Sequence, residues 1–168
     1  DAEGNSKPYE INISLWDAMV GTHQSGPDGL QFARFICAAA VMIALEGVPA
    51  LYIHSLLATE NDFERIEHTG SFRSINRHVW DVDQLEQQLS AETHHKKIFE
   101  AMLSLLKIRR KQPAFHPNAT MYTLHTGESL FAFWRQSINR SQSIFAVYNI
   151  TNEPQTFNLS ELNLVITD

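Results

Sequence analysis

The longest apolar stretch of the chain predicts a buried helix. Between Phe32 and Leu45, apolar residues fall on nearly every side of a helical projection, so we expect burial on more than one face. Pro27 suits the first helical turn, because its fixed φ and missing N–H cost nothing there, and Gly47 is a stop signal. The pattern therefore predicts a helix over residues 27–46 that lies between other layers.

A second apolar run follows directly after that stop. Residues 48–53 are too few and too β-prone for another buried helix, and their lack of alternation predicts a strand covered on both faces. Strands of this kind belong to parallel sheets, and one lone parallel strand has nothing to pair with. We therefore expect its neighbouring strands to lie outside this sequence.

Helical spacing and capping residues predict four further helical segments. They are a brief turn that Ser14 caps and Gly21 ends, a short helix over 61–67, a helix over 82–89 that Asp81 caps, and a helix over 92–110. The helix over 92–110 carries Ile98, Met102, Leu105 and Leu106 on one face.

The apolar pattern changes from a helical period to short extended runs after Pro117, which predicts an antiparallel sheet. Helices first and strands later give an α+β fold, or two unlike pieces joined by a linker at residues 113–117. The expected strands cover residues 121–124, 130–134, 144–148, 156–159 and 164–166.

Composition narrows the possible functions only modestly. With 43% hydrophobic and 19% charged residues the chain has enough apolar material for a core, and its net charge of −6 argues against a nucleic-acid partner. The basic residues at 96–97 and 107–111 fit a solvated helix face. The apolar run around Cys37 is too short to span a bilayer, and the cysteine itself fits a small core residue. We expect a cytoplasmic protein without a membrane partner.

Two arginines in one loop are the main candidates for chemistry. Arg73 and Arg77 lie four residues apart, with Asn76 between them, and His54 stands at the end of the predicted strand. Guanidinium groups donate paired hydrogen bonds to carboxylates, phosphates or sugar hydroxyls, so the loop could clamp an anion or a sugar. The alternative is structural: the arginines would pair with Asp62, Glu64, Glu67 or Asp81, and His54 would be a satisfied rim histidine.

A second candidate segment precedes the first helical turn. Tyr9, Glu10 and Asn12 could line a ligand pocket, although a partly buried tyrosine with a satisfied hydroxyl is the commoner case. No His, Cys and carboxylate residues have the spacing of metal ligands, and His94 and His95 point to different sides of a helix. We expect neither a metal nor another cofactor.

Several of these segments together carry a family resemblance. They are Pro-Tyr-Glu-Ile-Asn-Ile-Ser at 8–14, Ala-Leu-Glu-Gly-Val-Pro-Ala-Leu-Tyr-Ile-His-Ser-Leu at 44–56, Asn61-Asp62, Gly70, Arg-Ser-Ile-Asn-Arg at 73–77, and Pro-Ala-Phe-His-Pro-Asn-Ala-Thr at 113–120. In combination they resemble the sucrose phosphorylase branch of the α-amylase family, glycoside hydrolase family 13. The resemblance covers essentially the whole chain.

The resemblance implies a fragment of a larger enzyme. Residues 1–112 would be the last part of a catalytic (β/α)8 barrel, with 48–53 as its eighth strand, and residues 118–168 most of an antiparallel β-sandwich domain. The family cleaves α-glucosides with retention, using carboxylates on strands four, five and seven. Their motifs, Arg-x-Asp and His-Asp, do not occur in this sequence. We therefore expect the isolated chain to be inactive.

The resemblance also assigns candidate ligand contacts. It implies that Arg73 clamps glucose hydroxyls and that Tyr9 lies near the phosphate and acceptor, with Arg77, Asn76 and His54 as supporting residues. The implied ligands are a sugar, namely sucrose, glucosylglycerate, glucosylglycerol or phosphorylated sucrose, and inorganic phosphate. Two alternatives stay open: a hydrolase as parent, or a structural module that binds no ligand and self-associates through the apolar helix 27–46.

Overall fold

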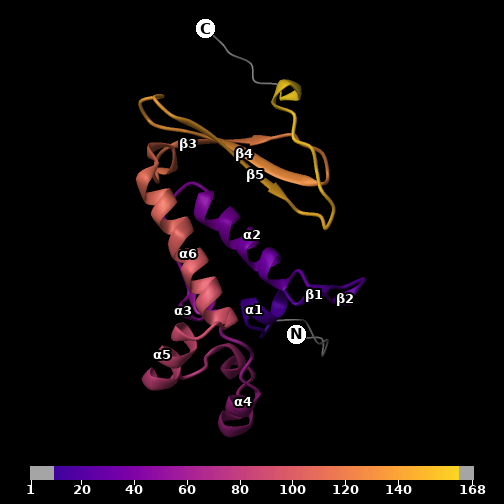
Figure 1. Cartoon of the computed structure of the whole chain (residues 1–168), viewed down its shortest axis with the longest axis vertical. Helices are drawn as coiled ribbons and strands as arrows, with labels where there is room; N and C mark the ends of the chain where they lie inside the picture. The colour runs from indigo at the N-terminus through magenta and orange to yellow at the C-terminus, as the bar shows by residue number, and fades with distance from the viewer. Residues whose placement is uncertain (1–9, 163–168) are drawn as a thin grey trace, which may run out of the picture. The chain divides into compact units, whose positions relative to one another are not determined.

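The computed structural model describes residues 10–162, which form two compact units. The first unit comprises the described residues up to Phe35 together with Leu51–Glu100. The second comprises Ile36–Ala50 and the described residues from Ala101 onward. Helices α2 (Gln31–Ala44) and α6 (His94–Lys111) contribute residues to both units (Figure 1).

Short helices and connecting loops make up most of the first unit. Two of the predicted caps are confirmed, because Ser14 accepts a hydrogen bond from the Asp17 N–H and Asp81 accepts one from the Gln84 N–H. Besides parts of α2 and α6, the unit contains α1 (Leu15–Ala18), the strand pair β1 (Gly21–Thr22) and β2 (Gly26–Pro27), α3 (Ile53–Leu56), α4 (Phe63–Thr69), the 3₁₀ turn η1 (Phe72–Asn76) and α5 (Val82–Ser90).

Helix α2 begins later than the sequence predicts. Pro27 lies in β2, opposite Gly21, and the helix starts only at Gln31. The carboxylate of Asp28 accepts a hydrogen bond from the Leu30 N–H at 2.8 Å, which holds a turn before the helix. The prediction of Pro27 as the first helical turn was wrong, since proline is tolerated equally well at the edge of a short strand pair.

The predicted strand over residues 48–53 does not form. Residues 48–52 have no regular structure and Ile53 begins α3, although the backbone at Tyr52 is extended with φ −76° and ψ 133°. A strand needs a neighbour for its N–H and C=O groups, and none of the strands in residues 10–162 pairs with this segment. The expected burial was also wrong, because Val48 is 81% exposed.

Three antiparallel strands form the sheet of the second unit, in the order β3-β4-β5 (Figure 1). They are β3 (Thr120–Leu124), β4 (Leu130–Gln136) and β5 (Ser143–Asn149), and they confirm the first three predicted strands. The predicted strand over 156–159 was wrong, because Asn158 instead caps the 3₁₀ turn η3 (Leu159–Glu161) by accepting from the Ser160 N–H. The predicted strand over 164–166 lies outside the described residues.

The core of the second unit joins the sheet to the end of α2. Ala44, Phe133 and Ala146 are its buried members, and Phe131 and Tyr148 pack against them. Burial, with a smaller effect from Cys37, raises the pKa of the Tyr148 hydroxyl to about 12, and this hydroxyl donates to the Ala40 carbonyl at 3.2 Å. The unit has the hydrophobic centre that an independent domain needs.

Two buried arginines complete this core. The Arg135 side chain is fully buried, and its Nη1 and Nη2 donate to the carbonyls of Ala44 at 2.8 Å and His116 at 2.9 Å. Arg109 donates to the carbonyls of Ile43, Leu45 and Gly47. Together they satisfy carbonyls that the end of a helix leaves unpaired. The prediction that the basic run at 107–111 is solvated was therefore wrong for Arg109.

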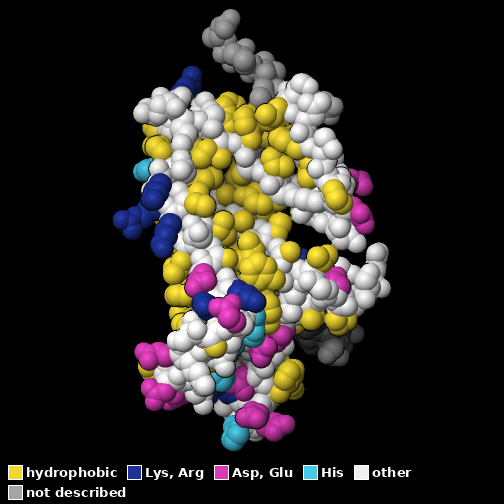
Figure 2. Space-filling view, viewed as in Figure 1, with side chains coloured by type: hydrophobic (Ala, Val, Ile, Leu, Met, Phe, Trp, Pro, Cys, Tyr) yellow, Lys and Arg dark blue, Asp and Glu magenta, His cyan; other side chains and the backbone are white. Residues whose placement is uncertain are grey.

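Charged side chains have different distributions in the two units. Asp, Glu and His side chains gather over α4 and α5, whereas Lys and Arg side chains line the outer side of α6 (Figure 2). In the part of the chain that the structure describes, no helix has the length and apolar character needed to cross a bilayer. The α+β description, helices plus an antiparallel sheet, is confirmed, and the domain boundary near residues 112–118 stays a prediction.

Candidate functional site

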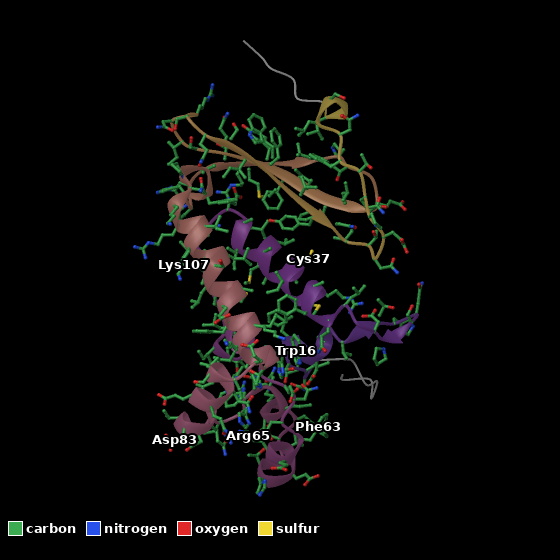
Figure 3. All side chains as sticks on the ribbon, viewed as in Figure 1. Trp16, Cys37, Phe63, Arg65, Asp83 and Lys107 are labelled. Atoms are coloured by element: carbon green, nitrogen blue, oxygen red, sulfur yellow. The ribbon has the colours of Figure 1, made fainter. Side chains whose placement is uncertain are left out.

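All the candidate ligand residues that the structure describes belong to the first unit. Arg73 and Asn76 lie on η1, Arg77 follows it directly, and His54 lies on α3. Tyr9 lies outside the described residues. Near this region the labelled Trp16 side chain packs against Phe35, with ring centroids 5.8 Å apart, and anchors α1 to the start of α2 (Figure 3).

Arg73 forms an ion pair that the sequence did not predict. Its Nε donates to Oε1 of Glu10 at 2.6 Å, with side chains 48% and 35% exposed, respectively. The partner is none of the four acidic residues expected from sequence proximity. It lies 63 positions away, in the segment next to Tyr9, so this pair links two of the segments that carry the family resemblance.

Arg77 differs from Arg73 in its surroundings. Its side chain is exposed and forms no hydrogen bond or ion pair with the described residues, while its backbone N–H donates to the Ser74 carbonyl at 3.1 Å. The guanidinium therefore keeps all five donors for solvent or a ligand. Of the two arginines, Arg77 is the one whose hydrogen-bonding capacity is unused by the described chain.

The arginine loop, defined here as residues 72–78, is held by a few specific hydrogen bonds. The Asp62 N–H donates to the Ile75 carbonyl at 2.7 Å. Asn76 donates through Nδ2 to the Ile13 carbonyl at 3.3 Å and accepts at its own carbonyl from the Tyr52 hydroxyl at 2.9 Å. Asn76 thus has a structural role here, alongside the ligand contact predicted for it.

His54 is engaged within the protein. Its Nδ1 lies 3.2 Å from Oγ1 of Thr59, and its ring stands edge-on to Tyr52 with centroids 5.0 Å apart. Burial, and secondarily the neighbouring His78, lowers the pKa of His54 below its ordinary value. A neutral imidazole with these partners fits the rim histidine that the sequence left open, and its ligand role stays a prediction.

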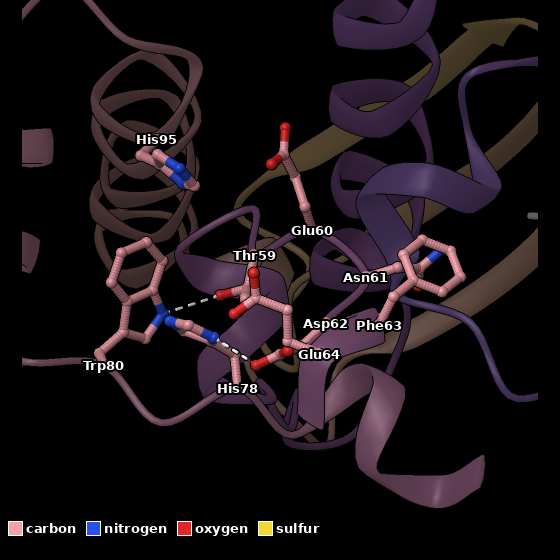
Figure 4. Close-up of a pocket in the computed structure, with 9 residues that line it drawn as sticks. All are labelled: Thr59, Glu60, Asn61, Asp62, Phe63, Glu64, His78, Trp80 and His95. Carbon is pink, nitrogen blue, oxygen red and sulfur yellow. Dashed lines mark hydrogen bonds and ion pairs between the residues drawn. The ribbon is translucent and has the colours of Figure 1, made fainter. Parts of the chain in front are cut away.

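A hollow of about 450 Å³ lies beside the arginine loop (Figure 4). Carboxylates, histidines and aromatic rings share its wall, whereas none of the arginines and lysines in residues 10–162 lines it. The lining residues are Thr59, Glu60, Asn61, Asp62, Phe63, Glu64, His78, Trp80 and His95. With three carboxylates and no Lys or Arg among its described lining residues, the hollow can accept hydrogen bonds from hydroxyl or amine groups but is unsuited to an anion.

Two side-chain hydrogen bonds organise the wall of this hollow, as the dashed lines of Figure 4 show. His78 Nδ1 lies 2.6 Å from Oδ2 of Asp62, and Trp80 Nε1 donates to Oγ1 of Thr59 at 3.0 Å. Partial burial raises the pKa of Asp62, but the hydrogen bonds from His78 and from the Arg65 N–H outweigh this and hold it below its ordinary value. Asp62 is therefore ionised at neutral pH.

The sequence did not identify His78 as a site residue. Asp62 and His78 are separated by 16 positions and belong to no local motif. Only the Asn61-Asp62 dipeptide within the family resemblance pointed to one half of the pair. Within residues 10–162, no group of three or more His, Cys, Asp or Glu side chains is placed to hold a metal ion.

Curated proteins similar to this chain share one kind of activity in their names. A glucosylglycerate phosphorylase of Allomeiothermus silvanus is 32% identical over 98% of this chain and 29% of its own length. A glucosylglycerate phosphorylase of Spirochaeta thermophila is 34% identical over 88% of the chain and 25% of its own length. A sucrose phosphorylase of Bifidobacterium adolescentis is 27% identical over 86% of this chain and 26% of its own length.

Comparisons with family models and with solved structures carry no further argument about this chain. No family model matches the chain. A solved sucrose 6F-phosphate phosphorylase from Thermoanaerobacter thermosaccharolyticum aligns with a TM-score of 0.48 and 20% identity, over 73% of this chain and 25% of that one.

This α+β chain with an arginine loop is similar along nearly its whole length to proteins that are named phosphorylases. More closely, the resemblance to the sucrose phosphorylase branch of glycoside hydrolase family 13 is confirmed, and the chain is related to its glucosylglycerate and sucrose phosphorylases. The chain spans less than a third of the length of these relatives.

Proposed function

We propose that this chain is the C-terminal part of an α-glucoside phosphorylase. The observation that carries the proposal is its 32% identity to a glucosylglycerate phosphorylase over 98% of the chain. In such an enzyme a carboxylate forms a covalent glucosyl intermediate, a second acts as acid and base, and phosphate receives the glucosyl group. The catalytic carboxylates would lie in the parent outside this sequence, so the isolated chain would be inactive.

Glucosylglycerate is the first substrate to test. The two glucosylglycerate phosphorylases are 32% and 34% identical to the chain, against 27% for the sucrose phosphorylase. The test measures phosphate-dependent formation of glucose 1-phosphate by the full-length parent from glucosylglycerate, sucrose, glucosylglycerol and sucrose 6F-phosphate. Cleavage of one of these without phosphate would make the parent a hydrolase, and no cleavage of any would overturn the proposal.

The exposed segment before α3 supports a barrel as the parent fold. Val48 is 81% exposed, and Tyr52 keeps an extended backbone without a strand partner. In a complete (β/α)8 barrel residues 48–53 would pair as the eighth strand, with 1–112 as barrel and 118–168 as β domain. In the isolated chain these apolar side chains would favour self-association, so sedimentation of the purified chain should show species larger than a monomer.

The arginine loop would contact the sugar and phosphate. The family resemblance assigns glucose hydroxyls to Arg73, and its pairing with Glu10 leaves the planar group held in place for such contacts. Arg77, exposed and uncommitted among the described residues, is the second guanidinium available to a ligand. Tyr9, Asn76 and His54 are proposed as supporting contacts, Asn76 and His54 mainly by shaping the loop around the arginines.

Single substitutions in the parent separate these roles. Arg73→Ala and Arg77→Ala should each lower kcat/KM at least about tenfold, about 1.4 kcal/mol of transition-state binding. Glu10→Ala is the matched control, because it removes the ion pair and keeps the guanidinium. In the Glu10→Ala background, Arg73→Ala should still lower kcat/KM, and no further loss there would mean that Arg73 acts only through its ion pair and that the proposed substrate contact is wrong.

A further inference from the structure

One residue fastens both sides of the segment that carries Arg77. The backbone N–H of Asp62 donates to the Ile75 carbonyl at 2.7 Å, and its carboxylate bonds to His78 at 2.6 Å. Arg77 lies between these two attachment points, one residue from His78 and two from Ile75. On the N-terminal side, η1 and the bond from the Arg77 N–H to the Ser74 carbonyl at 3.1 Å also hold the Arg77 backbone, whereas on the C-terminal side the bond between Asp62 and His78 holds it.

Asp62 is itself held rigidly. Its Oδ1 accepts a hydrogen bond from the Arg65 N–H at 2.8 Å, which caps the first turn of α4. Its side chain is only 16% exposed, and that of His78 is 32% exposed, so the bond between them is partly shielded from water. A capped helix terminus has a well-defined position, and the hydrogen bond between Asp62 and His78 holds the arginine loop next to it.

The imidazole is also held from its other side. The Trp80 ring stands edge-on to His78 with centroids 4.8 Å apart, and Trp80 Nε1 donates to Oγ1 of Thr59 at 3.0 Å (Figure 4). The indole therefore restricts rotation of the His78 ring. Asp62 bonds to Nδ1 and the Trp80 indole packs against the ring, so these two neighbours together fix the orientation of the imidazole.

We propose that Asp62 and His78 form a positioning pair that fixes Arg77 for contact with the substrate. The proposal rests on the proposed function, since it concerns the same arginine loop. His78 touches neither sugar nor phosphate in this scheme and acts only through the placement of Arg77. Small displacements of such a group have large effects on turnover, because a shift of about 1 Å can cost about 100-fold.

A double-mutant cycle in the full-length enzyme tests this. His78→Phe should lower kcat/KM at least about fivefold, whereas His78→Asn, whose amide nitrogen can replace Nδ1, should recover it to within about twofold of the wild type. In the Arg77→Ala background, His78→Phe should change kcat/KM by less than about twofold. Equal losses in both backgrounds would show that His78 acts independently of Arg77 and would overturn the proposal.

Hydrogen exchange supplies a readout that does not depend on activity. In the same proteins, His78→Phe should speed exchange of the Asp62 amide, which donates to Ile75, while His78→Asn should preserve its protection. His125→Phe is the matched control, since His125 is exposed and makes no side-chain hydrogen bond among the described residues. Unchanged protection in His78→Phe would overturn the positioning role.

The double-mutant cycle and the hydrogen-exchange experiment together distinguish failure of this inference from failure of the proposed function. A wild-type parent that cleaves none of the four glucosides would refute the phosphorylase assignment, and the exchange experiment would then still decide whether His78 fixes the loop. An active parent with additive losses in the cycle would refute the positioning pair alone.

Discussion

The two units of this chain are stabilised in different ways. In the second unit, seven residue pairs join β4 to β5, and Phe133, 1% exposed, lies at the centre of an apolar core. In the first unit, the arginine loop depends on single hydrogen bonds such as that between Asp62 and His78. A repeated ladder tolerates the loss of one contact, whereas a loop held by single bonds does not.

The surfaces of the two units do not differ in the same way. Large apolar side chains are exposed in both, among them Ile11 at 88% and Phe72 at 74% in the first unit, and Val48 at 81% and Ile138 at 64% in the second. Exposed apolar residues on this scale mark surfaces that are covered by other parts of a protein or by a partner. Both units therefore present apolar surface that other parts of a protein or a partner could cover, and the difference between them lies in the apolar core of the second unit.

Substituting one phenylalanine in each unit should produce the largest contrast. Phe133→Ala removes a ring from the core and should lower the free energy of unfolding by about 3–5 kcal/mol, through lost burial and the cavity left behind. Phe72→Ala, the matched substitution at a 74% exposed position, should change it by less than about 0.5 kcal/mol. Urea denaturation followed by circular dichroism measures both.

Equal effects of the two substitutions would contradict the comparison. A large loss for Phe72→Ala would mean that the first unit buries this ring in solution, against a surface that the isolated chain does not show.

Arg135, one of the two buried arginines of the second unit, should give the next largest effect. Arg135→Leu leaves the carbonyls of Ala44 and His116 without their donors, and each buried acceptor without a partner costs about 1–3 kcal/mol. Some of this is offset because the guanidinium itself no longer has to be desolvated. We expect a net loss of about 2 kcal/mol in the same urea experiment. A variant as stable as the wild type would show that the two carbonyls find other donors.

Much of this architecture was predictable because its causes are local. The Ser14 and Asp81 caps, the long helix ending near residue 111 and three strands follow from spacing and capping within short windows. Residues 48–53 were mispredicted because a strand depends on a neighbour, which the residues themselves cannot supply. The strand expected over 156–159 failed because Asn158 caps a turn there instead.

The site was less predictable than the fold. The loop with Arg73 and Arg77 was found from its residue types, but the partner of Arg73 lies 63 positions away and that of His78 lies 16 away. The buried roles of Arg109 and Arg135 were missed because arginine is usually exposed. Interactions between distant positions leave no periodic trace in one sequence, so they could not be predicted from it.

Acidification should weaken the first unit before the second. Burial lowers the pKa of His54 and of His94, and the folded Asp62 also has a lowered pKa despite its partial burial. For each group the unfolded chain binds more protons than the folded one, so stability rises with pH through its titration range. The two histidines lower the stability as the pH falls below about 6.5, and Asp62 lowers it as the pH falls below about 4.

Tryptophan fluorescence can follow this pH effect unit by unit. Trp16 and Trp80 report on the first unit in a Trp134→Phe variant, because Trp134 lies in β4 of the second. The urea midpoint from this signal should fall between pH 7.5 and pH 5, and His54→Gln should reduce the shift. A midpoint that rises on acidification would mean that the histidines gain rather than lose protonation on folding.

The smallest effect is expected at Arg73, an exposed arginine of the first unit. Arg73 and Glu10 are 48% and 35% exposed, and such pairs typically contribute about 0.2–1 kcal/mol, decreasing with salt. A stability double-mutant cycle of Arg73→Ala and Glu10→Ala at low and high salt should measure a coupling in this range. A coupling above about 2 kcal/mol would make Arg73 a structural residue comparable to Arg135. A small value would mean that the ion pair with Glu10 contributes little to stability, which is compatible with the substrate contact that the proposed function gives to Arg73.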